Sequence, residues 1–214
     1  VGDCDCDCHC ACPIDDIVPP VLSLPMMYYL ELTFACNNSC PACANVDSHQ
    51  GYSAPVLRAT QWEAIITQLA SHACHFKITG GEPTLHPDFG EIVGLIETMG
   101  IHFTLFSNAR WTEPQHLIRV LQAMDMCDGL LVSLHGHRAA IHEVFTGTVG
   151  SFEETVTNVR LAAEAGLDLA VSMVINAVNF DSIEKNLELA LDLRANHLVC
   201  NRLIGSSAPG LAPT

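Results

Sequence analysis

The amino-acid sequence predicts an α/β fold, an incomplete (βα)6 barrel with a parallel, TIM-like sheet. Strand-like and helix-like segments alternate through most of the chain, and such alternation implies parallel strands joined by right-handed crossovers. The chain has 214 residues, of which 49% are apolar, so it can bury the core that this fold needs. Six repeats, the last without its helix, predict a barrel that does not close.

Six segments are predicted to be strands because they are short apolar runs bounded by turn residues. They are 26–34, 76–79, 101–106, 130–134, 167–175 and 197–203. The carboxyl ends of parallel strands share one edge of the sheet, where α/β folds carry their functional groups. The residues that follow each strand are therefore the first candidates for a site.

Five helices are expected between these strands. Three begin with a capping box, in which a Ser or Thr is followed three residues later by Glu or Gln. The boxes pair Thr60 with Glu63, Thr112 with Gln115, and Ser151 with Glu154. Two further helices lack a box: 87–99, and 181–194, whose Ile183, Leu187 and Leu191 are expected to face the sheet.

The charge of the chain limits its partners. The formal net charge is −15 and the only lysines are Lys77 and Lys185, which argues against a nucleic-acid partner because that needs a basic surface. No apolar run is long enough to cross a bilayer and the N-terminus lacks the layout of a secretory signal, so we expect no membrane partner and a cytoplasmic location. Eleven cysteines scattered among βα units favour metal ligation over disulfides.

Residues 1–25 differ from the rest because cysteines alternate with Asp and His9 from Cys4 to Cys12, before a proline-rich connector. This segment is either a thiolate site for a soft metal or a disordered tail. We expect the tail, because alternate residues of an extended chain spread their thiols along a line. Residues 26–214 are expected to form one core domain that is truncated at its C-terminus, since the chain stops just after a strand.

Three cysteines, Cys36, Cys40 and Cys43, lie in the short loop that follows the first strand. Three thiolates on one loop can hold three corners of a four-iron cluster and leave the fourth iron open to a small molecule. The alternative is structural zinc, with His49 as the fourth ligand of a closed tetrahedron. The cysteines alone leave both interpretations open.

A second motif, Gly80-Gly81-Glu82-Pro83, ends the second strand. Paired glycines let the backbone approach a ligand closely, because they lack a Cβ atom. The Glu82 carboxylate can accept a hydrogen bond from a cationic amino group. A structural zinc site does not account for this second motif.

The two motifs in this order resemble those of the radical S-adenosylmethionine (radical SAM) superfamily, and the resemblance covers residues 26–204. It implies an incomplete barrel of the radical SAM type with a [4Fe-4S] cluster. It also implies that Cys36, Cys40 and Cys43 bind the cluster and that S-adenosylmethionine chelates the open iron. Gly80, Gly81 and Glu82 would hold the amino group of that cofactor.

Later strand ends match the family less sharply. By resemblance, Asn108 after the third strand and Ser133 at the fourth contact the carboxylate and ribose of the cofactor, and Asn176 after the fifth lies beside the adenine. A lone polar residue at a strand end is also a common turn former. The sequence departs from the family pattern at Ala42, where many members have an aromatic residue that packs against the adenine.

The resemblance implies that a low-potential donor of the ferredoxin or flavodoxin type reduces the cluster. S-adenosylmethionine is then cleaved to a 5′-deoxyadenosyl radical, which takes a hydrogen atom from a peptide or a cofactor precursor. The stretch 133–152 and the ending 201–205 resemble the branch of molybdenum-cofactor and pyrroloquinoline-quinone maturases, which often carry a C-terminal cysteine-rich (SPASM) extension. The alternative from another class is a non-catalytic iron-sulfur or zinc module, such as an electron carrier.

Overall fold

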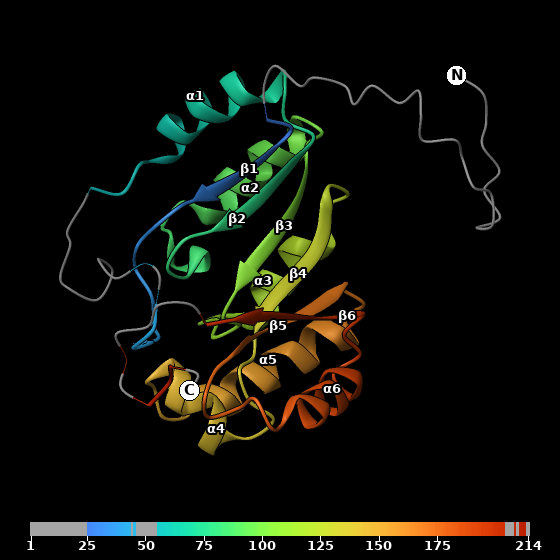
Figure 1. Cartoon of the computed structure of the whole chain (residues 1–214). Coiled ribbons are helices and arrows are strands. Elements are labelled where there is room, and N and C mark those ends of the chain that lie inside the picture. The colour runs from blue at the N-terminus through green and yellow to red at the C-terminus, as the bar shows by residue number, and fades with distance from the viewer. Residues whose placement is uncertain (1–24, 44, 46–54, 204–207, 209, 213–214) are drawn as a thin grey trace, which may run out of the picture.

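The computed structural model describes residues 25–43, 45, 55–203, 208 and 210–212. Six strands form one sheet in the order β1-β2-β3-β4-β5-β6, and every neighbouring pair is parallel. Their bounds are β1 Met27–Glu31, β2 His75–Thr79, β3 His102–Ser107, β4 Cys127–Ser133, β5 Leu169–Ile175 and β6 His197–Arg202. Strands β1 and β6 are the two edges and do not pair with each other, so the sheet is open (Figure 1). The fold prediction is confirmed; residues 1–24 and His49 lie outside the described residues.

Six α-helices connect the strands in the described part of the chain. They are α1 Ala59–Ala70, α2 Phe89–Thr98, α3 Pro114–Gln122, α4 Ala139–Thr146, α5 Ser151–Glu164 and α6 Ile183–Asp192. A short 3-10 helix, Pro83–Leu85, follows β2. Five of the α-helices were predicted, and α4 was not. None of the described helices combines the length and the apolar character that a membrane crossing needs.

The three predicted capping boxes are wrong, although the helices exist. Helix α1 begins at Ala59, whose backbone N–H donates to Asp88 Oδ2 at 2.9 Å. Helix α3 begins at Pro114, and α5 begins at Ser151 after Gly150, whose φ is 84°. The start of α1 therefore combines a local contact, from the Arg58 N–H to Gln61 Oε1 at 2.9 Å, with a contact to a distant residue, which a local pattern cannot show.

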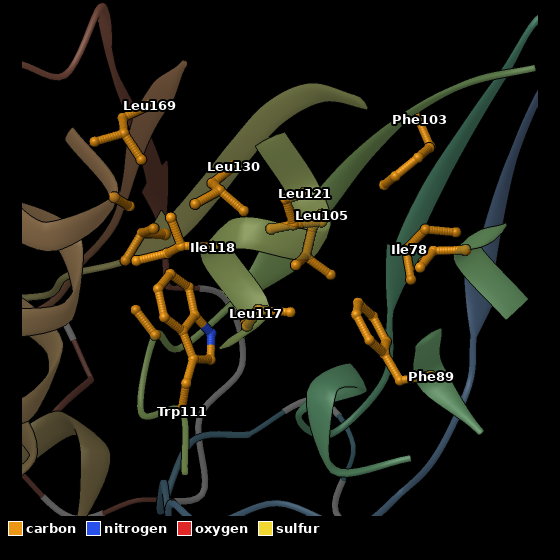
Figure 2. Close-up of a cluster of buried hydrophobic side chains, with 14 of the residues drawn as sticks. Ile78, Phe89, Phe103, Leu105, Trp111, Leu117, Ile118, Leu121, Leu130 and Leu169 are labelled. Carbon is orange, nitrogen blue, oxygen red and sulfur yellow. The ribbon is translucent and has the colours of Figure 1, made fainter. Parts of the chain in front are cut away.

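The larger of two hydrophobic clusters in the described residues lies between the sheet and the helices, and a smaller one joins Phe145, Leu203, Ala208 and Leu211. Strand residues that alternate toward this side, such as Phe76, Ile78, Phe103 and Leu105, have no exposed surface. They pack in one cluster with apolar residues of α1, α2, α3 and α5, and Figure 2 shows part of it around Trp111. Burying one such side chain stabilises a protein by about 1.5–3 kcal/mol, so this cluster is the main support of the strand ends.

Helix α6 is turned relative to the prediction. Leu187 and Leu191, which were expected to face the sheet, are 45% and 64% exposed. Asn186 and Ala190 are buried instead, and Asn186 Nδ2 donates to the carbonyl oxygen of Leu134 at 3.3 Å. The helix rotates because it satisfies a buried carbonyl group just beyond β4, which apolar spacing alone did not indicate.

Candidate functional site

The chain that leaves β1 runs beside the end of β2, and the two glycines of the second motif make this possible. The Gly81 N–H donates to the carbonyl oxygen of Thr33 at 2.7 Å, and the Glu82 N–H donates to that of Ala35 at 2.8 Å. A Cβ atom at Gly80 would lie 2.4 Å from Thr33 O, and one at Gly81 would lie 2.3 Å from Ala35 O. The glycines therefore seat the segment that leads into the cysteine loop, in addition to any ligand they contact.

Glu82 joins the end of β2 to the end of β3. It has no exposed surface, and its carboxylate accepts hydrogen bonds from Thr84 Oγ1 at 2.6 Å, Ser107 Oγ at 2.9 Å and the Asn108 N–H at 2.8 Å. Burial raises the pKa of Glu82, and the hydrogen bonds oppose that shift. These protein donors surround the carboxylate, so its predicted contact with a cofactor amino group stays a prediction. Within the described part of the chain, no hydrogen bond uses the carbonyl oxygens of Gly80 and Gly81.

Asn108 extends this connection to the cysteine loop. Its Nδ2 donates to Asn37 Oδ1 at 2.7 Å and lies 3.7 Å from Cys36 Sγ. Its Oδ1 accepts from the Arg110 N–H at 2.8 Å. The side chain was predicted to contact the carboxylate of the cofactor; the structure shows it bracing the loop that carries the first cysteine.

The thiols of the loop lie close enough to affect one another's charge. Burial, followed by repulsion from the thiolates of Cys43 and Cys36, raises the pKa of Cys40 to about 12. Burial also raises the pKa of Cys36, and the negative charges of Glu82 and Cys43 add to this. Cys36 and Cys40, two half-buried thiols whose pKa values are raised in this way, fit a cationic iron centre, because metal coordination offsets both penalties.

The arrangement is less suited to a single ion. Among the described residues, no three Cys, His, Asp or Glu side chains gather around one point as a mononuclear site requires. A four-iron cluster takes its thiolates at separate corners, so it does not need that convergence. The fourth ligand of the zinc alternative, His49, is outside the described residues.

Ser133 and Asn176 make no hydrogen bond to the cysteine loop. Ser133 is half-buried at the end of β4, and its hydroxyl makes no hydrogen bond within the described residues. Asn176 is buried and forms a turn after β5: its Nδ2 donates to Val174 O at 3.1 Å and its Oδ1 accepts from the Val178 N–H at 2.8 Å. Their predicted contacts with the ribose and adenine stay predictions.

Sequence reasoning missed Arg110, which lies near the site. Arg110 contacts the cysteine loop and helix α5, and its only sequence signal was its place two residues after Asn108. His135 and His142 form a buried pair in which the His135 N–H donates to His142 Nδ1 at 3.1 Å. Burial lowers the pKa of His135 to about 3 and that of His142 to about 4, so both are neutral near pH 7.

An open parallel barrel with a three-thiol loop after its first strand belongs to the class of α/β proteins that carry functional groups at the carboxyl ends of the strands. The chain belongs to the Radical SAM superfamily, whose family model matches residues 30–190. Members of this superfamily use a [4Fe-4S] cluster and S-adenosylmethionine, so the expected cofactors and the suspected family are confirmed.

Relatives of known function support this membership. The chain is 30% identical over 174 residues to the AdoMet-dependent heme synthase of Methanosarcina barkeri, covering 80% of this chain and 48% of that protein. It is 26% identical over 174 residues to the PqqA peptide cyclase of Ruegeria pomeroyi, covering 81% and 46%. The chain thus spans about half the length of these curated relatives.

Solved structures agree on the fold. The Streptococcus suis protein SuiB bound to S-adenosylmethionine superimposes with a TM-score of 0.78 at 16% identity, covering 90% of this chain and 44% of SuiB. SuiB has also been solved with its precursor peptide SuiA, and that structure matches with a TM-score of 0.76 at 17% identity, covering 86% and 40%.

Proposed function

We propose that this chain is the catalytic core of a radical SAM enzyme that modifies a peptide. The observation that carries the proposal is the three-thiol loop, seated by Gly80 and Gly81 and braced by Asn108 at the carboxyl ends of parallel strands. When bound, the cluster and S-adenosylmethionine supply a 5′-deoxyadenosyl radical that takes a hydrogen atom from the substrate. The activity is that of an oxidoreductase.

The residues of the chain have separate tasks in this proposal. Cys36, Cys40 and Cys43 hold the cluster. The unused carbonyl oxygens of Gly80 and Gly81 accept hydrogen bonds from the amino group of the cofactor. The nearby core residues keep water away from the strand ends, where a radical needs a dry site.

Further residues are proposed for the rest of the cofactor. The carboxylate of Glu82 fixes the end of β2 relative to β3, which keeps the glycine carbonyl groups in place. Asn108, Ser133 and Asn176 are proposed for the carboxylate, ribose and adenine sides. Within the described residues the Ser133 hydroxyl makes no hydrogen bond, so it is available to bind the ribose.

A peptide is the favoured substrate because one relative is a PqqA peptide cyclase and a structural neighbour binds a precursor peptide. A cofactor precursor is the other class, as in the heme synthase. The proposal also includes a ferredoxin- or flavodoxin-type electron donor and a cytoplasmic location. Residues 26–214 are proposed as the core domain of a longer protein, which the full-length coding sequence would test.

The test is electron paramagnetic resonance on anaerobically reconstituted, reduced protein, with and without S-adenosylmethionine. We expect a [4Fe-4S]+ signal that changes when the cofactor is added, because the open iron takes new ligands. A signal indifferent to the cofactor, or zinc in place of iron, would favour the non-catalytic iron-sulfur or zinc module. Incubation with candidate peptides and a reductant, read as 5′-deoxyadenosine formation and peptide mass change, tests the substrate class.

A further inference from the structure

The guanidinium of Arg110 lies between the cysteine loop and helix α5. Its Nη1 atom donates to the carbonyl oxygen of Asn37 and, at 3.0 Å, to Asn38 Oδ1. Its Nε and Nη2 atoms donate to the two carboxylate oxygens of Glu154 at 2.8 and 3.3 Å. The Arg110 side chain is only 12% exposed, whereas that of Glu154 is 51% exposed. The guanidinium therefore bridges the loop and helix α5, and it is the more buried partner of the ion pair.

Asn37 is held from three directions by the segment that follows β3. Its Nδ2 donates to the carbonyl oxygen of Arg110 at 2.7 Å, while its own carbonyl oxygen accepts from the Arg110 guanidinium. Its Oδ1 accepts from Asn108 Nδ2 at 2.7 Å. Because Asn37 directly follows Cys36, these bonds fix the backbone between the first and second cysteines.

The backbone that carries Arg110 is itself held in an uncommon conformation. Ala109 has a φ of 57°, in the left-handed region that residues with a Cβ rarely adopt. Its N–H donates to Ser107 Oγ at 2.9 Å, and its carbonyl oxygen accepts from Asn158 Nδ2 at 2.8 Å. Such conformations persist where the surroundings fix them, and they are common at functional sites. The turn directs the Arg110 side chain toward the cysteine loop.

We propose that Arg110 is a positioning residue for the iron-sulfur cluster: it fixes the loop between Cys36 and Cys40, and its charge raises the reduction potential of the cluster. This inference rests on the proposed function. The cluster gains one negative charge on reduction, and a cation held against its loop in a half-buried site stabilises the reduced form. Lysine cannot replace the planar fork that donates to Asn37, Asn38 and Glu154 at once.

The first experiment uses the cluster-free protein and follows amide hydrogen exchange of residues 36–40 by mass spectrometry. We expect at least a tenfold faster exchange in Arg110→Gln and Arg110→Lys, because both lose the fork. Arg160→Gln is the matched control, since Arg160 lies on α5 and forms an exposed ion pair with Asp192. Exchange as slow as in the wild type in both Arg110 variants would overturn the loop-fixing role.

The second experiment is a potentiometric titration of the reconstituted cluster, followed by electron paramagnetic resonance. We expect Arg110→Gln to lower the midpoint potential, Arg110→Lys to stay closer to the wild type because it keeps the charge, and Arg160→Gln to leave it unchanged. Equal potentials in wild type and Arg110→Gln overturn the electrostatic role only. If the wild type takes up no [4Fe-4S] cluster, the proposed function fails and the electrostatic role fails with it, while the exchange experiment still decides the loop-fixing role.

Discussion

The polar residues after β2 and β3 differ from those after β4 and β5. Glu82, Asn108 and Arg110 hydrogen-bond to one another's segments and reach the cysteine loop. Asn176 and the His135–His142 pair are just as buried, yet their hydrogen bonds stay within the turns and strands of the second half. A polar residue at a strand end therefore has two roles in one sheet: it braces the cofactor loop in the first half and stabilises local turns in the second.

The largest effect is expected in the loop itself. Cys40→Ala should abolish cluster binding, because two thiolates from one loop cannot hold three corners of a cluster. Iron and sulfide content and the visible absorption of reconstituted protein measure this. Cys200→Ala is the control, since Cys200 is an exposed thiol on edge strand β6. Equal iron content in wild type and Cys40→Ala would contradict the ligand assignment.

Gly81→Ala should destabilise the protein, and it should also weaken the cluster. The new Cβ would meet backbone atoms of Ala35 and Phe34 at 2.3 and 2.6 Å, and forced overpacking of this kind costs about 1–3 kcal/mol. Gly94→Ala in helix α2 is the matched control, because a Cβ there meets nothing within 4 Å and Ala is favoured over Gly in helices by about 1 kcal/mol. In denaturant unfolding, the free energy of unfolding should fall in Gly81→Ala and rise in Gly94→Ala, each relative to the wild type.

Glu82→Ala and Asn176→Ala test whether the two halves differ as described. Each loses hydrogen bonds within the protein, and a buried donor left without a partner costs about 1–3 kcal/mol. Glu82→Ala should retain the cluster but weaken S-adenosylmethionine binding, because the glycine carbonyl groups lose their support. Asn176→Ala should also retain the cluster, and it should weaken S-adenosylmethionine binding less than Glu82→Ala does, because it removes only the proposed adenine contact. Calorimetric titration of S-adenosylmethionine into each reconstituted variant measures the difference, and intact affinity in Glu82→Ala would refute the role of that residue.

The effect expected of the histidine pair is confined to acidic conditions and appears as a pH dependence of stability. His135 and His142 have pKa values lowered by burial to about 3 and about 4, so the unfolded chain binds their protons first as the pH falls. Stability should therefore be highest above about pH 6.5 and fall toward pH 4, with a slope of up to about 1.4 kcal/mol per pH unit for each histidine. His142→Gln should flatten this slope relative to wild type. His116→Gln, on the exposed side of α3, should not.

Sequence alone was sufficient where the signal is local. The spacing of Cys36, Cys40 and Cys43 and the order of strands depend on neighbouring residues, and the fold and family follow from them. Arg110 was not predicted, because its partner Asn37 is 73 residues away and a single arginine forms no recognisable sequence motif.

The predicted helix boundaries and the predicted buried face of α6 were wrong because they too depend on residues distant in the sequence. Asp88, 29 residues from Ala59, contributes to the start of α1, and the carbonyl group of Leu134 accepts a hydrogen bond from the buried face of α6. Both are tertiary contacts that override local preference. The paired glycines were predicted to let a ligand approach closely, which stays a prediction; in the structure the segment that approaches them includes residues 33–35 of the chain itself.

The open sheet has a practical consequence for handling this chain. Within the described residues, β1 and β6 each leave one side of the strand without a neighbour, and Met27, Tyr29 and Val199 are 48%, 59% and 38% exposed there. An unpaired strand with exposed apolar residues is a template on which another chain can add a strand. Purification of residues 26–214 should therefore yield self-association that grows with protein concentration, and charged substitutions at Met27 and Val199 should suppress it.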